Sequence, residues 1–196
     1  MKKIIQASLL ALTASHAMGA TVSESKKAIT VQDLVNLERV LDPRLSPDGR
    51  AAIYTLRQTD YGANKGVKNI WVADLGGKDT PRQLTTAGGS DARFSPDGKW
   101  IYFLSSRSGS SQVWRLYGQG GEPQQVSKLP LDVGTFILSP DGKQLALSLE
   151  VFPDCKDLDC SKKRLDDEAA RKSTGMVFDK LFVRHWDTWK NGARAQ

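Results

Sequence analysis

Three short stretches decide how this chain folds: Leu45-Ser46-Pro47-Asp48-Gly49-Arg50, Phe94-Ser95-Pro96-Asp97-Gly98-Lys99 and Leu138-Ser139-Pro140-Asp141-Gly142-Lys143. Their serines lie 49 and then 44 residues apart, so the stretches are copies of one internal repeat. In each copy proline presets φ for a tight turn, aspartate bonds its own backbone, and glycine accepts the positive φ that follows. The sequence therefore predicts the same hairpin turn three times.

Strand-like residues follow every copy of this turn, most clearly in the second copy. That copy resolves into four strands, which we expect at residues 92–95, 99–105, 112–117 and 123–127. The first copy matches it strand for strand, and Trp71 aligns with Trp114. Four antiparallel strands in about 45 residues are typical of a β-propeller blade. The predicted fold class is all-β, an incomplete β-propeller.

The repeats supply two full four-stranded blades, over about residues 44–90 and 91–134, and part of a third over residues 135–196. Propellers close with about four to eight blades. We therefore expect a fragment of a longer protein or a truncated gene product. An unclosed end leaves an apolar sheet face unpaired, so this piece alone is expected to be poorly soluble.

The third blade is expected to be interrupted. Its first two strands are predicted at residues 135–139 and 143–152, followed by an insertion over residues 153–179. A third strand is predicted over residues 180–189, after which Lys190-Asn191-Gly192 turns the chain.

Residues 1–20 have the three-part pattern of a secretory signal peptide: Lys2 and Lys3, an apolar run over residues 4–14, and small residues. The apolar run is too short to span a bilayer. Cleavage after Ala17, Gly19 or Ala20 fits the pattern, and Ala20 is favoured. The segment holds two Lys and no acidic residue, so its removal takes the formal charge from +6 to +4. We expect an exported protein, periplasmic or secreted.

An N-terminal helical segment, residues 21–43, should precede the first blade. Thr30-Val31-Gln32-Asp33 resembles a capping box, which predicts a short helix through Val40. Leu34, Leu37 and Leu41 would share one face of this helix. Asp42-Pro43 is expected to end the helix and lead into the first strand.

The composition is that of a folded soluble protein, with 39% hydrophobic and 26% charged residues and two cysteines among 196 residues. These values exclude a disordered chain, a collagen and a disulfide-dense miniprotein. The basic residues are scattered along the chain, so nucleic acid is not an expected partner. No later stretch reaches 18 consecutive apolar residues, so no membrane attachment is expected after signal cleavage.

The insertion carries both cysteines, Cys155 and Cys160. In an oxidising compartment this close pair predicts a small-loop disulfide, with free thiols or another partner as the alternatives. Zinc lacks further ligands nearby, and the acidic residues between 154 and 159 do not fit a calcium loop, so no metal is expected. Residues 161–173 are rich in charge and helix formers, which predicts a solvated helix that either decorates the rim or docks a partner.

Catalytic machinery is not expected in this chain. The aspartates of the repeats, Asp48, Asp97 and Asp141, are interpreted as turn residues. His185 is interpreted as a packed strand histidine, because no Gly-x-Ser-x-Gly nucleophile motif accompanies it. The nearest approach to that motif, residues 88–92, lacks the final glycine and precedes a strand. Gly118-Gln119-Gly120-Gly121 lacks the helix that follows a nucleotide-binding loop, so no cofactor is expected.

Two further segments suggest a family. They are residues 29–49, which run into the first Ser-Pro-Asp-Gly turn, and residues 181–190, Leu-Phe-Val-Arg-His-Trp-Asp-Thr-Trp-Lys. Both segments resemble the bacterial exported peptidases of the prolyl oligopeptidase family, in the dipeptidyl aminopeptidase/acylaminoacyl-peptidase branch. The resemblance covers essentially the whole chain after the signal peptide. Ser-Pro-Asp-Gly alone is less specific, because many exported propellers carry it.

The resemblance implies that a C-terminal α/β-hydrolase domain follows the propeller in the parent protein. That domain would cleave oligopeptide substrates with a Ser-Asp-His triad, while the propeller gates access. None of the triad residues maps onto this sequence, so this chain by itself is expected to lack peptidase activity. The alternative is a non-catalytic periplasmic binding propeller of the Tol-system type, which shares the repeated turn and the signal peptide.

Overall fold

The structure is a computed structural model that describes residues 28–178, 181 and 183–196, so the predicted signal peptide lies outside the described residues. Two helices and thirteen strands are described in these ranges. They are α1 (Val31–Asn36), β1 (Arg39–Leu45), β2 (Ala51–Asp60), β3 (Lys65–Asp74), β4 (Arg82–Gln83), β5 (Ser90–Phe94), β6 (Trp100–Ser105), β7 (Gln112–Tyr117), β8 (Gln124–Gln125), β9 (Val133–Leu138), β10 (Leu145–Val151), α2 (Leu158–Ala170), β11 (Arg184–His185), β12 (Thr188–Trp189) and β13 (Arg194–Ala195).

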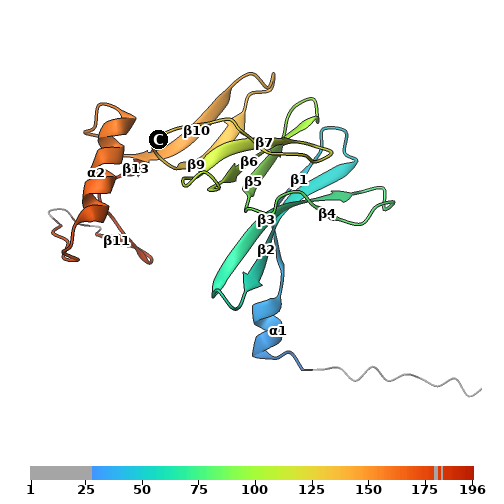
Figure 1. Ribbon diagram of the computed structural model, residues 1–196, viewed down its shortest axis with the longest axis horizontal. Helices are drawn as coiled ribbons and strands as arrows, with labels where there is room; N and C mark the ends of the chain where they lie inside the picture. The colour runs from blue at the N-terminus through green and yellow to red at the C-terminus, as the bar shows by residue number, and fades with distance from the viewer. Residues whose placement is uncertain (1–27, 179–180, 182) are drawn as a thin grey trace, which may run out of the picture.

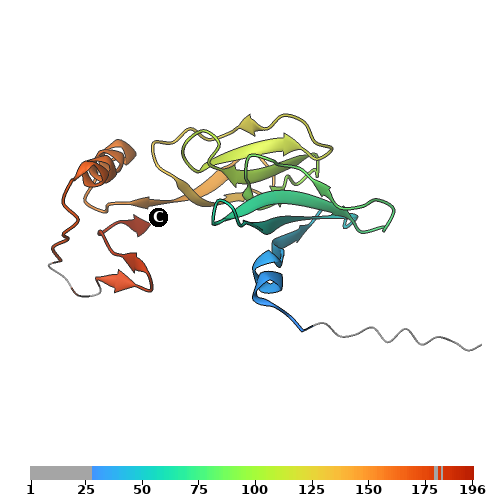
Figure 2. The ribbon, with the colours of Figure 1, turned by 60° about the horizontal axis from the view of Figure 1, so that its bottom comes forward.

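The strands form three antiparallel sheets, which fan out side by side in Figures 1 and 2. The first sheet has the order β1-β2-β3-β4, the second β5-β6-β7-β8 and the third β13-β10-β9, while β11 and β12 form a separate hairpin. Two complete four-stranded blades and part of a third are the architecture that the repeats predict. The ring is not closed, so the all-β, incomplete-propeller prediction is confirmed.

The repeated turns have the same geometry in all three sheets. The amides of Gly49, Gly98 and Gly142 each donate to the carbonyl of the serine three residues earlier, at 2.9 Å. All three glycines have φ close to +70°, a conformation that strains residues with a Cβ atom. Glycine is therefore needed at the fourth position of the repeat, in the turn that joins the first two strands of each sheet.

Apolar side chains fill the two spaces between the sheets. Between the first and second sheets lie the buried Ile53, Ile70, Ala92, Ile101, Phe103 and Leu116, and between the second and third lie Tyr102, Leu104, Val113, Val133 and Phe136. Successive residues of β6 alternate between these two cores, as successive side chains of a strand must. The second sheet is thus buried on both faces, which explains why β6 is a continuous apolar run.

The capping box predicted before the first sheet is present. The Asp33 amide donates to Thr30 Oγ1 at 3.2 Å, and the Thr30 amide donates to Asp33 Oδ2 at 2.9 Å. The helix that it caps is shorter than predicted, because α1 ends at Asn36. Leu34 and Leu37 both remain exposed.

The prediction that Asp42-Pro43 ends a helix is wrong. Strand β1 already begins at Arg39, because the 10-residue β2 is long enough to pair with it, with Arg39 opposite Arg57. The Asp42-Pro43 pair instead forms a bulge inside β1, where the register shifts between Leu41 and Arg44. Proline tolerates this position because a bulge removes the need for a ladder hydrogen bond.

The third strand of the third sheet also differs from its prediction. It is β13, in which Ala195 lies opposite Glu150 and Arg194 opposite Val151, and not residues 180–189. Residues 180 and 182 lie outside the described residues, and residues 184–189 form the hairpin β11–β12. A two-residue turn closes this hairpin locally, which requires less ordering of the chain than a return to β10.

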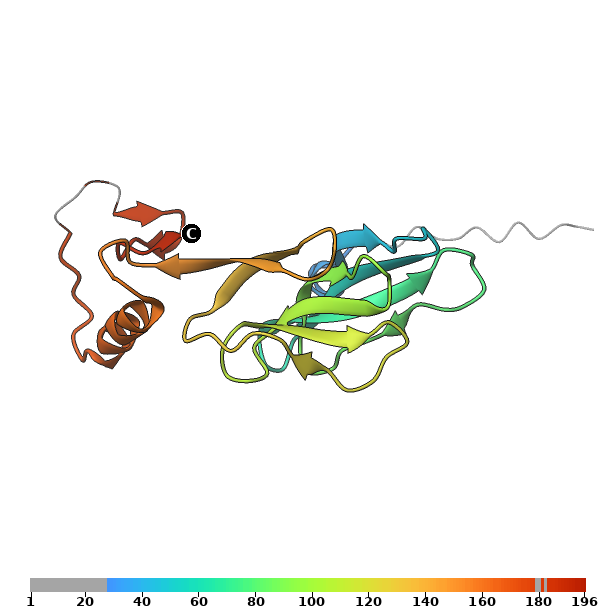
Figure 3. The ribbon, with the colours of Figure 1, turned by 90° about the horizontal axis from the view of Figure 1, so that it is seen from above.

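Helix α2 and the β11–β12 hairpin lie at the far end of β10, near β13 and away from the first and second sheets, as the view from above in Figure 3 shows. Helix α2 begins at Leu158, three residues before the predicted start, because the Asp157 carboxylate accepts from the Cys160 amide at 2.8 Å and caps it. Among the residues that the structure describes, no helix has both the length and the apolar character needed to cross a membrane.

Candidate functional site on the inner strands

The first strands of the three sheets lie next to one another and carry polar side chains at equivalent positions. Asp42 of β1, Asp91 of β5 and Thr135 of β9 each stand four residues before the serine of a repeated turn. Arg44 and Arg93 stand two residues before it. In a propeller the blades surround a central channel, so these side chains belong to the wall of that channel.

A continuous set of ion pairs and hydrogen bonds joins these strands. Arg93 contacts Asp42 through Nη1 and Asp91 through Nη2, both at 2.5 Å. Arg44 contacts Asp42 at 2.8 Å, and Thr135 Oγ1 donates to Asp91 Oδ2 at 2.8 Å. The Arg93 side chain is 24% exposed, so two carboxylates surround a largely buried guanidinium. Because each Asp bonds a residue of the next sheet, the chain of contacts links all three sheets.

The backbone explains how the aspartates reach their partners. Asp42 has φ of 46° and Asp91 has φ of 54°, the left-handed region that Asp adopts more readily than most residues. Both lie at register shifts of their strands, and such bulges re-aim side chains. The third sheet also has a register shift next to this position, between Val133 and Thr135, but it carries Thr135 and Ile137 where the first two sheets carry Asp and Arg.

A cavity of about 340 Å³ opens beside this set of ion pairs. Arg44 and Arg93 line it together with three prolines of the repeated turns and apolar residues of the inner strands. The lining therefore combines positive charge with rigid apolar surface. Such a wall can select what passes or binds by charge and shape.

The charged side chains of the inner strands are engaged mainly with one another. The cluster contains carboxylates, guanidinium groups and one hydroxyl, but Asp42 and Asp91 are engaged with arginines. Within the described ranges no group of three or more His, Cys, Asp or Glu side chains could hold a metal ion. The arrangement is suited to binding and selection.

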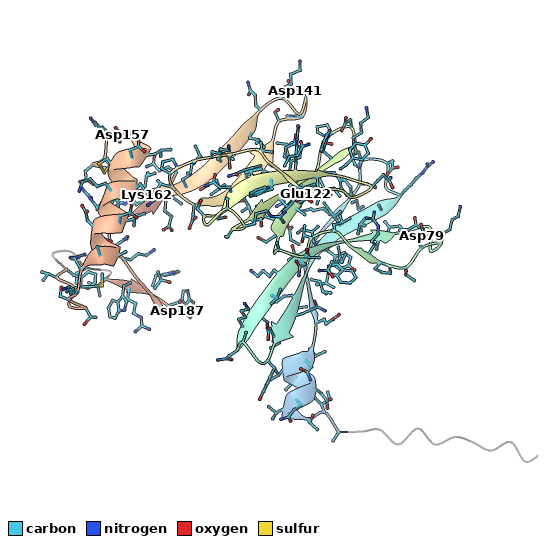
Figure 4. The ribbon with its side chains drawn as sticks, in the orientation of Figure 1. Asp79, Glu122, Asp141, Asp157, Lys162 and Asp187 are labelled. Atoms are coloured by element: carbon cyan, nitrogen blue, oxygen red, sulfur yellow. A yellow bond between two sulfur atoms is a disulfide. The ribbon has the colours of Figure 1, made fainter. Side chains whose placement is uncertain are left out.

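The aspartates of the repeats occupy the turns, as interpreted from sequence. The Ser46 hydroxyl and then the Arg50 amide bond the Asp48 carboxylate and lower its pKa. Equivalent serine hydroxyls and backbone amides lower the pKa of Asp97 and of Asp141. Figure 4 shows Asp141 at the tip of its hairpin, away from α2 with Asp157 and Lys162. These carboxylates stabilise turns and do not converge on a site.

Cys155 and Cys160 are joined by a disulfide at the start of α2. The insertion is further fixed by Ser161, whose buried Oγ accepts from the Phe152 amide at 3.1 Å. Arg164 lies over the Phe152 ring, 4.4 Å from its centroid, and pairs with Asp154 at 2.6 Å. Helix α2 is therefore attached firmly at its first turns.

The interpretation of His185 as a packed strand residue is wrong, because His185 is exposed on β11. Its ring centroid lies 6.1 Å from that of the equally exposed Trp186. The hairpin pairs with none of the three sheets, and its described residues belong to neither of the two cores. Residues 88–92, the near-match to the nucleophile motif, are predicted to precede a strand. Ser90 is the first residue of β5, so a strand follows as predicted.

Sequence reasoning did not find the inner-strand cluster, although a signal for it exists. Asp-x-Arg precedes the first two turns, as Asp42-Pro43-Arg44 and Asp91-Ala92-Arg93, and is replaced by Thr135-Phe136-Ile137 before the third. Extending the repeat four residues upstream reveals this pattern. The pairing between sheets cannot be read from it, since it depends on which strands become neighbours.

Radial antiparallel sheets, each with the repeated turn between its first two strands, define an open β-propeller. Residues 23–168 match the TolB beta propeller domain family. The match covers most of the chain, so this protein belongs to that family.

Similar proteins include peptidases. The chain is 30% identical to the peptidase YuxL of Bacillus subtilis over 128 residues, which are 64% of this chain and 20% of YuxL. It is 29% identical to dipeptidyl-peptidase 5 of Porphyromonas gingivalis over 191 residues, 96% of this chain and 27% of that protein. The chain thus spans about a fifth to a quarter of these curated relatives.

A solved structure shows the same fold. Acylaminoacyl peptidase of Pyrococcus horikoshii superposes with a TM-score of 0.52 at 20% identity, over 63% of this chain and 19% of that one. At this level of identity the likeness concerns the fold alone. It supports the propeller assignment.

Proposed function

We propose that this chain is the substrate-gating propeller portion of an exported serine peptidase that hydrolyses short peptides, of the dipeptidyl or acylaminoacyl-peptidase type. The observation that carries the proposal is the match to dipeptidyl-peptidase 5, which takes in 96% of this chain but only 27% of that protein. The part of dipeptidyl-peptidase 5 that this match does not cover is long enough for a further domain. By analogy, the parent chain would carry a C-terminal α/β-hydrolase domain. Catalysis would belong to that domain.

The inner strands supply a physical basis for gating. Arg93 is held between two carboxylates, whereas Arg44 has one and keeps a half-exposed guanidinium beside the cavity. Fixed charges on a channel wall raise or lower the local concentration of charged solutes. Peptides that enter along these strands would be sorted by width and by charge.

Export is the second part of the proposal. The basic, apolar and small-residue pattern of residues 1–20 supports a signal peptide. The Cys155–Cys160 disulfide supports an oxidising compartment, where such bonds persist. The protein would then act in the periplasm or outside the cell, without membrane attachment after cleavage.

The test uses the protein expressed from the complete open reading frame. A fluorophosphonate probe should label one serine, and the Arg44→Glu variant should change the ratio of kcat/KM for acidic over basic peptides several-fold, because wall charge affects entry. Probe labelling should be unchanged, because Arg44 lies outside the chemistry. Absence of labelling would refute the peptidase assignment, and an unchanged ratio would refute the gating role.

A non-catalytic periplasmic binding propeller of the Tol-system type is the second candidate. The observation that favours it is the family match itself, which is to the TolB beta propeller domain. In that case the open reading frame would encode further repeats and no serine motif. The fluorophosphonate experiment separates the two candidates directly.

A further inference from the structure

A second cleft lies between the first and second sheets, at the rim opposite the repeated turns. It has a volume of about 540 Å³ and is lined by the start of β3, the link between β4 and β5, and the loop after β6. Glycine and serine residues form much of its wall, and Lys65, Lys68 and Arg107 contribute its charged side chains. No acidic residue lines this cleft in the described part of the chain.

Two cationic side chains of the first sheet lie beside each other here, and Lys68 of this pair lines the cleft. Arg57 of β2 lies directly opposite Lys68 of β3, and like charges at opposed positions destabilise a sheet. The Arg57 guanidinium also lies against Gly66, where an added Cβ would come within 2.5 Å of Nε. The absence of a side chain at Gly66 therefore gives this guanidinium its place.

The second sheet contributes Arg107 from the opposite wall. Its guanidinium carbon lies 5.2 Å from the ring centroid of Phe103 and 5.0 Å from that of Trp114. Nη2 donates to the Gly88 carbonyl at 3.2 Å and Nε to Ser105 Oγ at 3.0 Å. Burial lowers the pKa of Arg107, and the charge of the Glu122 carboxylate offsets part of this effect.

Two carboxylates near these strands, Glu38 and Asp60, have other partners. Gln58, which neighbours Arg57 and so faces the other side of β2, donates to Glu38 at 2.6 Å. Asp60 accepts from the Ala63 amide at 2.9 Å within its own hairpin. Across the described residues Arg57, Lys68 and Arg107 form no ion pair, in contrast to Arg93 of the inner strands.

We propose that this cleft binds a carboxylate of an acidic peptide. Partly buried cations need a compensating charge, and a carboxylate meets a guanidinium through two parallel hydrogen bonds. Ser105 and Ser111 already bond groups of the protein, so Ser90 and Ser106 are the wall serines whose hydroxyls can bond a peptide backbone. The volume lies in the range of pockets that hold small ligands. The site is separate from the inner-strand wall and does not depend on the proposed gating role.

The test is isothermal titration of the protein expressed from the complete open reading frame with acetyl-Glu-Glu-amide, with acetyl-Gln-Gln-amide and with inorganic phosphate. We expect the dicarboxylate to bind more weakly as NaCl is raised, and the neutral analogue not to bind. Arg107→Gln should weaken binding about tenfold or more, and Lys68→Gln about threefold. Lys143→Gln removes the same charge at a repeated turn and should leave the affinity unchanged.

Three results would overturn the proposal. They are binding of phosphate but not of the dicarboxylate, equal binding of the neutral analogue, and equal losses for Lys143→Gln and Lys68→Gln. Arg107 packs on aromatic rings, so the far-ultraviolet spectrum of Arg107→Gln is compared with that of the parent chain. If Arg107→Gln unfolds, variants of the exposed Lys68 test the proposal instead. Lys68→Gln should weaken binding of the dicarboxylate, and Lys68→Glu should weaken it further.

Discussion

The first and second sheets come from the same repeat, yet they differ in what covers them. Phe103 lies opposite Trp114 in the second sheet and is fully buried against the first. Tyr54 lies opposite Trp71 at the equivalent place in the first sheet and is only half-buried. Leu45, the counterpart of Phe94, is 65% exposed. The comparison teaches that the repeat determines strands and pairing, whereas burial depends on a neighbouring sheet.

The same comparison extends to the inner strands. The first two sheets carry Asp and Arg before their turns, and the third carries Thr135 and Ile137. The chain of contacts therefore ends at Thr135, and Ile137 is exposed where its counterparts are arginines. Polar contacts link the sheets near the channel, while apolar layers hold them together further out.

The largest expected effect concerns the two equivalent aromatic positions. Phe103→Ala should lower the free energy of unfolding by about 3 to 5 kcal/mol, because a fully buried ring leaves a cavity. Tyr54→Ala should cost only about 1 to 2 kcal/mol, since its ring is already partly in water. Urea unfolding at 25 °C measures both, with the exposed Tyr61→Ala as the control. Equal losses would mean that the two faces are equivalently covered.

The next effect distinguishes the two arginines of the inner strands. Arg93→Gln should cost about 2 kcal/mol of unfolding free energy, because two carboxylates lose a largely buried partner. Arg44→Gln should cost less than about 1 kcal/mol, as is usual for exposed pairs. The same unfolding measurement applies, at low and at high salt. A larger loss for Arg44 would show that the cluster is centred on the first sheet.

A smaller effect should be shared by all three sheets. The pKa values of Asp48, Asp97 and Asp141 are lowered, chiefly by the serine hydroxyl of each turn. These ionised carboxylates stabilise the folded state fully above the ordinary carboxyl pKa of about 4. This contribution is lost as the pH falls through their lowered pKa values in the folded protein. The urea midpoint should therefore fall as the pH drops below about 4. Asp97→Asn should flatten that fall, and an unaltered slope would count against the turn geometry.

The smallest effect is local to the segment before the first sheet. Thr30→Ala removes the capping hydroxyl of α1 and should destabilise that helix by about 1 kcal/mol. Hydrogen exchange at residues 31–36 should accelerate while the global urea midpoint stays constant, because no buried residue belongs to α1. A shift of the global midpoint would show that α1 is coupled to the sheets.

Much of the fold is predictable from sequence because it depends on local chemistry. The Ser-Pro-Asp-Gly turns, the four strands of each full blade and the Thr30 cap follow from residues close together in the chain. Two elements were not predictable, the bulge at Asp42 and the pairing of β13 with β10. Each of these depends on a partner strand, whose position the local sequence does not specify.

The candidate site divides in the same way. Cys155 and Cys160 are close enough in sequence for their disulfide to be anticipated. The contact between Arg93 and Asp42 joins residues of different sheets, and the charged cleft around Arg107 depends on two blades meeting. Repeats show which positions are equivalent, but only the packed structure shows which of them touch.

Reading the gene beyond the codon for Gln196 tests the central claim most directly. We expect an in-frame continuation with further repeats, which would cover the exposed face of the first sheet, and then a Gly-x-Ser-x-Gly motif followed by Asp and His. A stop codon within a few residues, or further repeats that end without a serine motif, would contradict the assignment to a gated peptidase.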